Sequence, residues 1–221
     1  MQRGIMEEIV IRDVEEADWP QIKKMIDDTW GFSDLFESEG ATDAALGLYF
    51  NQVLYNTSFG KAALVGGRLA GIIFGYANGE LPKFRMMMED PAAHIMSLLN
   101  MKEYERQNIN EFMTKLGGAY EGLLEEGGDY DGTLDFLVVS EEARGLKIGA
   151  RLWEEVKAYF QEKKARAIYV FTDTECNFGF YEHLGFSRRA QTPLTYVFAG
   201  ERLEVEVYLY DYKFCVTGDL P

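Results

Sequence analysis

Hydrophobic positions near the start of the chain first alternate with polar ones and then recur at helical spacing. Residues 8–12 (EIVIR) therefore read as a short strand, and the residues after Asp18, which is expected to cap the next element, read as a helix. The stretch GFSDLFESEG, residues 31–40, reads as a loop. A second helix with one apolar stripe is expected to begin at Thr42 or Asp43.

The middle of the chain combines a hairpin signal with a long helical segment. Two β-type runs, residues 62–65 and 69–76, are separated by a short glycine-containing turn and predict a hairpin. The segment 82–129 then has apolar residues at helical spacing, a good helix start at Asp90-Pro91 and glycine pairs near its end. We expect it to be a helical insertion that lies over or beside the core.

The last third of the chain predicts the centre of a sheet. Residues 133–139 (TLDFLVV) are the clearest core strand, and residues 148–164 are the clearest amphipathic helix. A second buried strand, a short helix ending at Gly185 and a closing hairpin around Gly200 follow. Their strands are residues 167–173, 195–199 and 203–210. We see no internal repeat or linker, so residues 1–221 are expected to form a single α/β domain with a mixed sheet.

The net charge limits the class of partner. The chain has 22 Lys and Arg against 37 Asp and Glu, a formal charge of −15. General nucleic-acid binding needs a basic footprint, and an anionic membrane surface would repel this protein. The balance therefore argues against nucleic acid and membrane partners and favours a cationic small molecule or a basic peptide.

Cysteine and histidine are too few for several kinds of site. Cys176 and Cys215 give no disulfide framework and no metal spacing, and His94 and His183 are far apart. We therefore expect no metal centre and no Ser-His-Asp triad. The first residues, MQRGIMEEIV, have no apolar signal core, and no apolar run is long enough for a bilayer, so we expect a cytoplasmic protein.

The stretch ARGLKIGARL, residues 143–152, carries the first sign of chemistry. It joins a strand to a helix and contains Gly145, Gly149 and three basic residues. The first turn of a helix offers unpaired N–H groups and a positive dipole, and glycine lets a ligand come close, so a phosphate or pyrophosphate fits here. Neither the P-loop nor the dinucleotide-binding pattern matches. The alternative is a glycine turn with solvent-facing basic residues.

A second stretch of sequence, taken together with this loop, resembles a known family. NFGFYEHLGF, residues 177–186, resembles the closing motif of the GNAT superfamily of acyl-CoA-dependent N-acyltransferases, and VVSEEARGLKIGARL, residues 138–152, resembles that family's pyrophosphate loop. Lys147 stands where the family loop usually has its middle glycine, and Glu141 where it has proline. The resemblance implies a GNAT-like, mostly antiparallel twisted sheet flanked by helices, with the segment 82–129 as a helical insertion before the central strand.

The resemblance also implies how acetyl-CoA, the expected co-substrate, would be held. The two central strands would splay apart, and the pantetheine arm would pair with the backbone of Leu137, Val138 and Val139. Asn177 would hydrogen-bond this arm, although a plain helix N-cap is an equal alternative for Asn. The pyrophosphate would lie on residues Arg144, Gly145, Leu146, Lys147, Ile148, Gly149 and Ala150.

Three residues are candidates for proton transfer. By the resemblance, Tyr181 protonates the departing thiolate; the alternative is a core tyrosine that packs against Phe186. An amine must lose a proton before it attacks, and the family often supplies a carboxylate from the central strand. Asp135 is the first candidate base and Asp131 the second, because alternation places residues 131, 133, 135, 137 and 139 on one face. A capped or ion-paired aspartate is the alternative for Asp135.

The leading hypothesis is therefore transfer of an acetyl group from acetyl-CoA to a primary amine by direct attack in a ternary complex. The alternatives are a non-catalytic CoA-binding sensor or regulatory module, and a resemblance of fold alone. The sequence does not identify the amine, and the apolar late hairpin allows a homodimer. Residues expected around the acceptor are Trp30, Phe32, Phe36 and Tyr49, with Glu37 and Glu39 attracting a cation; the alternative for the aromatic residues is packing in the core.

Overall fold

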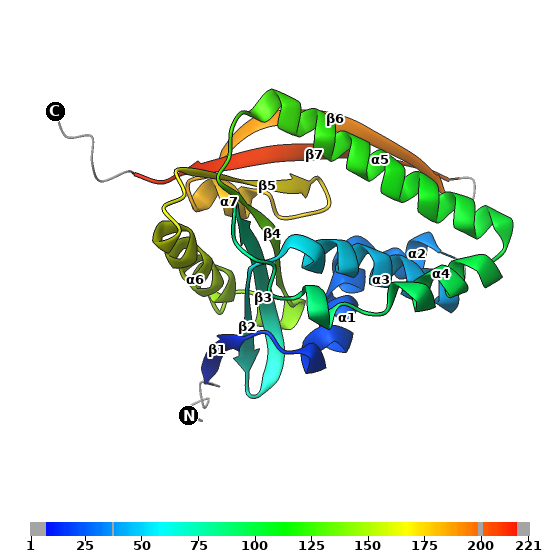
Figure 1. Cartoon of the computed structure of the whole chain (residues 1–221), viewed down its shortest axis with the longest axis horizontal. Coiled ribbons are helices and arrows are strands. Elements are labelled where there is room, and N and C mark those ends of the chain that lie inside the picture. Colours follow the sequence, from blue (N-terminus) through cyan, green and yellow to red (C-terminus); the bar gives the residue numbers. More distant parts are fainter. Residues whose placement is uncertain (1–7, 37, 199–200, 216–221) are drawn as a thin grey trace, which may run out of the picture.

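The computed structural model describes residues 8–36, 38–198 and 201–215 of the chain. Seven strands form one sheet in the order β1-β2-β3-β4-β5-β7-β6 (Figure 1). Only β4 and β5 run parallel; the other neighbouring pairs are antiparallel. The strands are β1 (Ile9–Asp13), β2 (Phe59–Val65), β3 (Arg68–Ala77), β4 (Gly132–Val139), β5 (Ala167–Asp173), β6 (Ser187–Phe198) and β7 (Glu201–Lys213). The expected mixed, mostly antiparallel α/β sheet is confirmed.

Helices cover both faces of this sheet (Figure 1). The α-helices are α1 (Trp19–Trp30), α2 (Phe32–Leu35), α3 (Glu39–Asn56), α4 (Pro91–Asn100), α5 (Glu103–Gly127), α6 (Ile148–Glu162) and α7 (Gly179–His183). Three short 3-10 turns are η1 (Glu16–Asp18), η2 (Arg85–Met87) and η3 (Glu141–Ala143). Among the described residues, no helix is both long and apolar enough to cross a membrane.

Two hydrophobic clusters, one on each face, show why the sheet needs both layers. On one face, side chains such as Ile22 of α1, Phe50 of α3 and Phe112 of α5 are buried together with β3 and β4. On the other, Leu152 and Phe160 of α6 are buried with the alternate residues of the same strands. Burial on both faces explains the long apolar runs of the central strands.

The segment 82–129 is helical as expected, and its long helix α5 lies along β6 and β7 (Figure 1). That the segment is an insertion stays a prediction. Leu194, Tyr196, Val207 and Leu209 of that hairpin are buried in the same cluster as Phe112 of α5. The helix therefore covers the apolar face of the hairpin from within the chain. The homodimer stays a prediction, but the apolar hairpin no longer argues for it.

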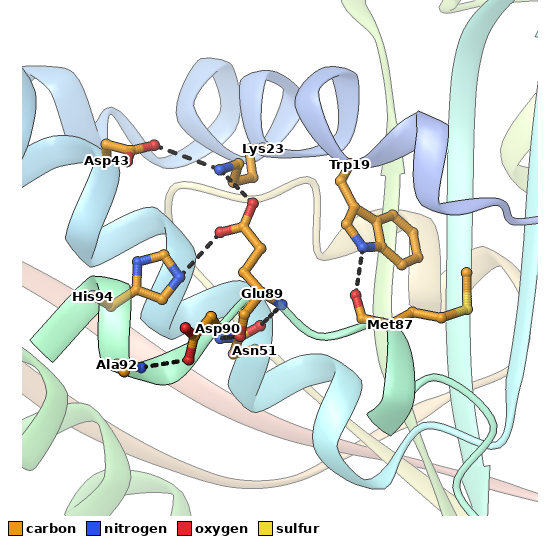
Figure 2. A network of polar contacts seen from close by, with 9 residues as sticks. All are labelled: Trp19, Lys23, Asp43, Asn51, Met87, Glu89, Asp90, Ala92 and His94. Atoms are coloured by element: carbon orange, nitrogen blue, oxygen red, sulfur yellow. Dashed lines mark hydrogen bonds and ion pairs between the residues drawn. The ribbon is translucent and has the colours of Figure 1, made fainter.

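A polar network fixes the start of the insertion to the helices α1 and α3 (Figure 2). The Glu89 carboxylate lies 2.7 Å from Lys23 Nζ and 3.1 Å from His94 Nε2. The Asn51 side chain donates to the Glu89 carbonyl and accepts from its N–H, each at 3.0 Å. The His94 ring lies directly over Gly47, where an added Cβ would come 2.1 Å from a ring carbon.

Several helix boundaries differ from the expectations. Asp18 precedes α1, but its side chain does not cap that helix; it accepts from the N–H of Glu15 and pairs with Arg12 at 2.7 Å. Helix α3 begins at Glu39, because the Ser38 hydroxyl caps it through the N–H of Ala41. The expected loop therefore holds α2 and the start of α3. Strand β6 begins earlier than predicted, and Gly200 lies outside the described residues.

Candidate functional site

A gap between β4 and β5 forms the site. The two strands pair only at their first residues, Gly132 with Ile168 and Thr133 with Tyr169. Beyond Thr133 they diverge, and a cavity of about 1070 Å³ opens between them. The edge of β4 that faces β5 keeps its backbone groups free there, as the expected splay requires.

A β-bulge at Asp135 shapes this gap. Strand β4 pairs with β3 so that Phe136 lies opposite Phe74 and Leu134 lies opposite Gly75. Asp135 between them has no partner and is the extra residue of the bulge. A bulge bends its strand and increases the local twist, which turns the rest of β4 away from β5.

The bulge also corrects the predicted alternation. Asp135 faces α3, where Thr57 Oγ1 lies 3.1 Å from Asp135 Oδ2. Leu137 and Val139 pack instead with the cluster on the α6 face. The prediction that residues 135, 137 and 139 share a face was wrong, because an extra residue shifts the period of two by one position.

The loop before α6 has the geometry of an anion site. The N–H groups of Ile148, Gly149 and Ala150 make no hydrogen bond with any described residue, and they open the first turn of a helix that runs to Glu162. Gly145 has a φ of 84° and open space where a Cβ would stand. Lys147 has a φ of 60°, so it adopts the left-handed backbone that usually requires glycine.

Nearly all the expected binding residues line the cavity. Leu146 is the exception: it is 44% exposed and does not line the cavity. Arg144 makes an exposed ion pair with Glu141 at 3.4 Å, whereas Lys147 and Arg151 have no ion pair with a described residue. The residues that line the cavity as expected are Leu137, Val138, Val139, Arg144, Gly145, Lys147, Ile148, Gly149, Ala150 and Asn177.

Asn177 does not serve as a helix cap. Helix α7 is preceded by Phe178 and has no side-chain cap, and the Asn177 side chain makes no hydrogen bond with the described residues. Its amide is therefore free for a ligand in the cavity that it lines. This arrangement is compatible with the binding role that the resemblance implies.

Tyr181 is buried and lines the cavity at the same time. Its ring packs edge-on against Phe186, with centroids 5.6 Å apart, as the structural alternative requires. Burial, and then the nearby Cys176 and Asp173, raise the pKa of Tyr181 well above its ordinary value. The phenol therefore keeps its proton, so its packing role does not exclude a role as a proton donor.

Asp135 and Asp131, the two candidate bases, have opposite environments. Burial raises the pKa of Asp135 to about 7, against the weaker effect of hydrogen bonds from Thr57 and Thr133. Asp131 does not line the cavity; it pairs with Arg166 at 3.0 Å, and this contact lowers its pKa to about 2. The structure thus brings Asp135 to the site. Asp131 lies outside it, where its ion pair with Arg166 joins the residues that directly precede β4 and β5.

The acceptor side of the cavity was only partly foreseen. Trp30 and Tyr49 line it, whereas Phe32 and Phe36 lie in the core, Glu39 does not reach it, and Glu37 is outside the described residues. Alternation along AIYVFTD would have found Tyr169, Phe171 and Asp173 on one face. No sequence pattern predicted that Tyr120 lines the cavity, because only the fold brings α5 to it.

No group of three or more His, Cys, Asp or Glu side chains in the described part of the chain is placed to hold a metal ion. Cys176 lies at the cavity, and burial raises the pKa of its thiol to about 12. A thiol that stays protonated is a poor nucleophile.

Comparisons with known proteins agree with this geometry. The model of the acetyltransferase (GNAT) family matches residues 111–186, which include both motifs and begin within α5. No curated protein is similar enough in sequence to count as a relative. The match to residues 111–128 shows that the family's pattern reaches into the segment that the sequence suggested as an insertion.

Solved structures share the fold at low identity. The ribosomal-protein-S18-alanine N-acetyltransferase from Escherichia coli is 12% identical, with a TM-score of 0.54 over 96% of this chain and 97% of that one. The ribosomal-protein-alanine N-acetyltransferase from Brucella melitensis is 13% identical, with a TM-score of 0.52 over 93% and 99%. A Salmonella typhimurium structure described as "a putative acetyltransferase" "with its cofactor Acetyl-CoA" is 13% identical, with a TM-score of 0.51 over 96% and 97%.

The resemblance seen in the two sequence motifs is therefore confirmed: residues 111–186 carry the GNAT acetyltransferase pattern, and the chain has the GNAT fold.

Proposed function

We propose that this protein transfers an acetyl group from acetyl-CoA to a primary amine, by direct attack within a ternary complex. The observation that carries the proposal is one continuous cavity. It is lined by the loop before α6, by carboxyl and aromatic groups from α1, α3, α5 and β5, and by Asp135 and Tyr181.

The loop and the strand edge fit the two parts of a CoA molecule. The free N–H groups of Ile148, Gly149 and Ala150, with Arg144 and Lys147 beside them, suit a pyrophosphate. The unpaired edge of β4 beyond the bulge suits the amides of a pantetheine arm. Acetyl-CoA bound by a related fold in the Salmonella typhimurium structure supports the choice of this ligand.

Two side chains that line the cavity, Asp135 and Tyr181, would carry out the proton transfers of the reaction. The amine nitrogen forms a bond to the acetyl carbon, and the bond from this carbon to sulfur breaks. Asp135, with a pKa of about 7, accepts the proton that the amine loses. Tyr181 donates a proton to the departing sulfur, and no covalent intermediate on Cys176 is needed.

Release of free thiol from acetyl-CoA in the presence of a panel of primary amines tests this proposal. We expect amine-dependent release that falls about a hundredfold or more in Tyr181→Phe, which keeps the ring but lacks the proton. Tyr181→Phe should still bind acetyl-CoA. If the parent binds acetyl-CoA but no amine releases thiol, the protein is a CoA-binding module instead of an enzyme.

A further inference from the structure

The cavity has an unusual charge balance. Four carboxyl groups line the cavity: Asp28, Asp135, Asp173 and Glu175. The only basic side chains that line it, within the described part of the chain, are Arg144 and Lys147 of the loop before α6. Asp28 is paired with Lys24 at 2.7 Å, whereas Asp135, Asp173 and Glu175 have no ion pair with a described residue, so a ligand beside these three groups meets a negative field.

Aromatic rings form the walls between these carboxyl groups. Tyr120 of α5 stacks on Phe171 of β5 with ring centroids 4.0 Å apart and planes 5° apart. Tyr169 meets Phe171 edge-on at 5.3 Å, and Trp30 lies 6.0 Å from Tyr49 on the other side. Aromatic faces attract ammonium groups and alkyl chains, and they repel anions.

Asp173, the last residue of β5, lines the same cavity. Its Oδ1 accepts the N–H groups of Glu175 and Cys176 at 2.9 and 3.1 Å, and it has no ion pair with any described residue. It contributes to the raised pKa of all four tyrosines that surround it, which are Tyr49, Tyr120, Tyr181 and Tyr196. Thr172 beside it, 6% exposed, also lines the cavity and leaves its hydroxyl unpaired apart from a weak contact with the Cys176 thiol.

One carboxyl group is enough to take the proton of a reacting amine, and Asp135 fills that role in the proposed reaction. Asp173 remains as a second acceptor that lines the same cavity as Asp135 and Tyr49, and its Oδ1 is held in place by two backbone N–H groups. Resting on the proposed function, we propose that the acceptor is a diamine: one amino group reacts beside Asp135, and the other stays charged and binds Asp173 between the aromatic rings.

The second ammonium group of a diamine, bound to Asp173, would also favour proton donation by Tyr181. The negative charge of Asp173 opposes ionisation of Tyr181, which the proposed proton donation requires. An ammonium group paired with Asp173 offsets that effect. A diamine would thus bind more tightly and also ease the transfer of the Tyr181 proton, whereas a monoamine would do neither.

The test compares putrescine with butylamine and with the amino alcohol of the same chain length, as acceptors and as ligands. We expect kcat/KM for putrescine to exceed the other two at least about tenfold, as for one charge-assisted contact. Asp173→Asn keeps the acceptor for the two N–H groups and should abolish this preference, which is read as the ratio of kcat/KM for putrescine to that for butylamine, because the variant also removes the charge that opposes ionisation of Tyr181. Glu125→Gln on the exposed side of α5 removes the same charge outside the cavity and should leave this ratio unchanged.

Two results would overturn the inference: equal use of the three compounds by the parent, or an undiminished preference in Asp173→Asn. If no compound is acetylated, calorimetric titration of putrescine into the CoA-saturated protein decides separately. Binding that Asp173→Asn removes would support the diamine site even though the proposed transfer fails. No binding of putrescine would overturn the diamine site, whatever the fate of the acetyl-CoA site.

Discussion

Lys147 adopts a backbone conformation that a side chain makes costly. Its φ of 60° lies in the left-handed region, at the residue that precedes the first turn of α6. The family loop usually has glycine at this position, so the backbone of the loop is kept although the residue differs. The sequence showed the substitution, but only the structure shows that the lysine takes the conformation of the glycine it replaces.

Lys147→Gly should therefore stabilise the protein and weaken its binding to CoA. Relief of left-handed strain should raise the free energy of unfolding by roughly 0.5–1 kcal/mol, net of the greater freedom of glycine in the unfolded chain. Loss of the cation should lower the affinity for acetyl-CoA. Urea unfolding and calorimetry measure the two effects. Lys147→Ala loses the cation but keeps the strain, so it should show the second effect without the first.

Asp135 should impose a pH dependence on activity. Its pKa is about 7, and only the ionised form accepts a proton, so kcat/KM should rise with pH up to about 7 and level off above it, as long as the amine itself is not limiting. Pre-steady-state and steady-state rates between pH 5 and pH 9 would be measured on the parent and on Asp135→Asn. A parent profile that is flat across pH 7 would contradict the role of Asp135.

The same residue should make stability depend on pH in a defined direction. Its pKa is raised from an ordinary 3.8, so the folded chain holds this proton more tightly than the unfolded chain. Stability contributed by the protonated group is present below about pH 4 and is lost as pH rises towards 7. Asp135→Asn should thus be more stable than the parent at pH 8, on the order of 1–3 kcal/mol, with a smaller difference at pH 5.

The sequence predicted that the segment 82–129 is helical, but it did not predict where these helices pack. The apolar spacing of residues 82–129 predicted helices, and Asp90 was a correct cap through the N–H of Ala92. Helical periodicity does not show which element a helix packs against. It therefore could not predict that α5 covers β6 and β7 or that Tyr120 lines the cavity. The anchor of the insertion likewise depends on contacts between residues far apart in the chain, such as Asn51 and Glu89.

Gly47→Ala should loosen this anchor. The added Cβ would stand 2.1 Å from the His94 ring, which must leave its place beside Glu89, so α4 would separate from α3. We expect a loss of about 1–3 kcal/mol in the free energy of unfolding, read by urea denaturation. Gly122→Ala in α5 meets no atom within 4 Å and should instead stabilise, by up to about 1 kcal/mol. A neutral Gly47→Ala would contradict the packing described for His94.

For the whole molecule, the sequence and its family resemblance predicted the sheet and the gap between its two central strands, but only part of the cavity lining. The strands, the amphipathic helix α6 and the two motifs were enough for the fold class, because local periodicity and the motif order agree. The bulge at Asp135 was the exception: one extra residue reverses the alternation, and no pattern in TLDFLVV marks it. The cavity residues proposed to surround the acceptor amine come from α1, α3, α5 and β5 together. Only some of them could be predicted, because the sequence does not show how these elements pack against one another.

The most direct test of the central claim is calorimetric titration of acetyl-CoA into the parent and into a matched pair of variants at Ala150. Ala150 is exposed in the first turn of α6 and lines the loop end of the cavity, where a glutamate is compatible with the helix. We predict tight binding by the parent and by Ala150→Gln, and a loss of at least about tenfold in Ala150→Glu, whose carboxylate would meet the pyrophosphate. Equal affinity of the two variants, or no binding by the parent, would contradict the assignment of this loop as the acyl-CoA site.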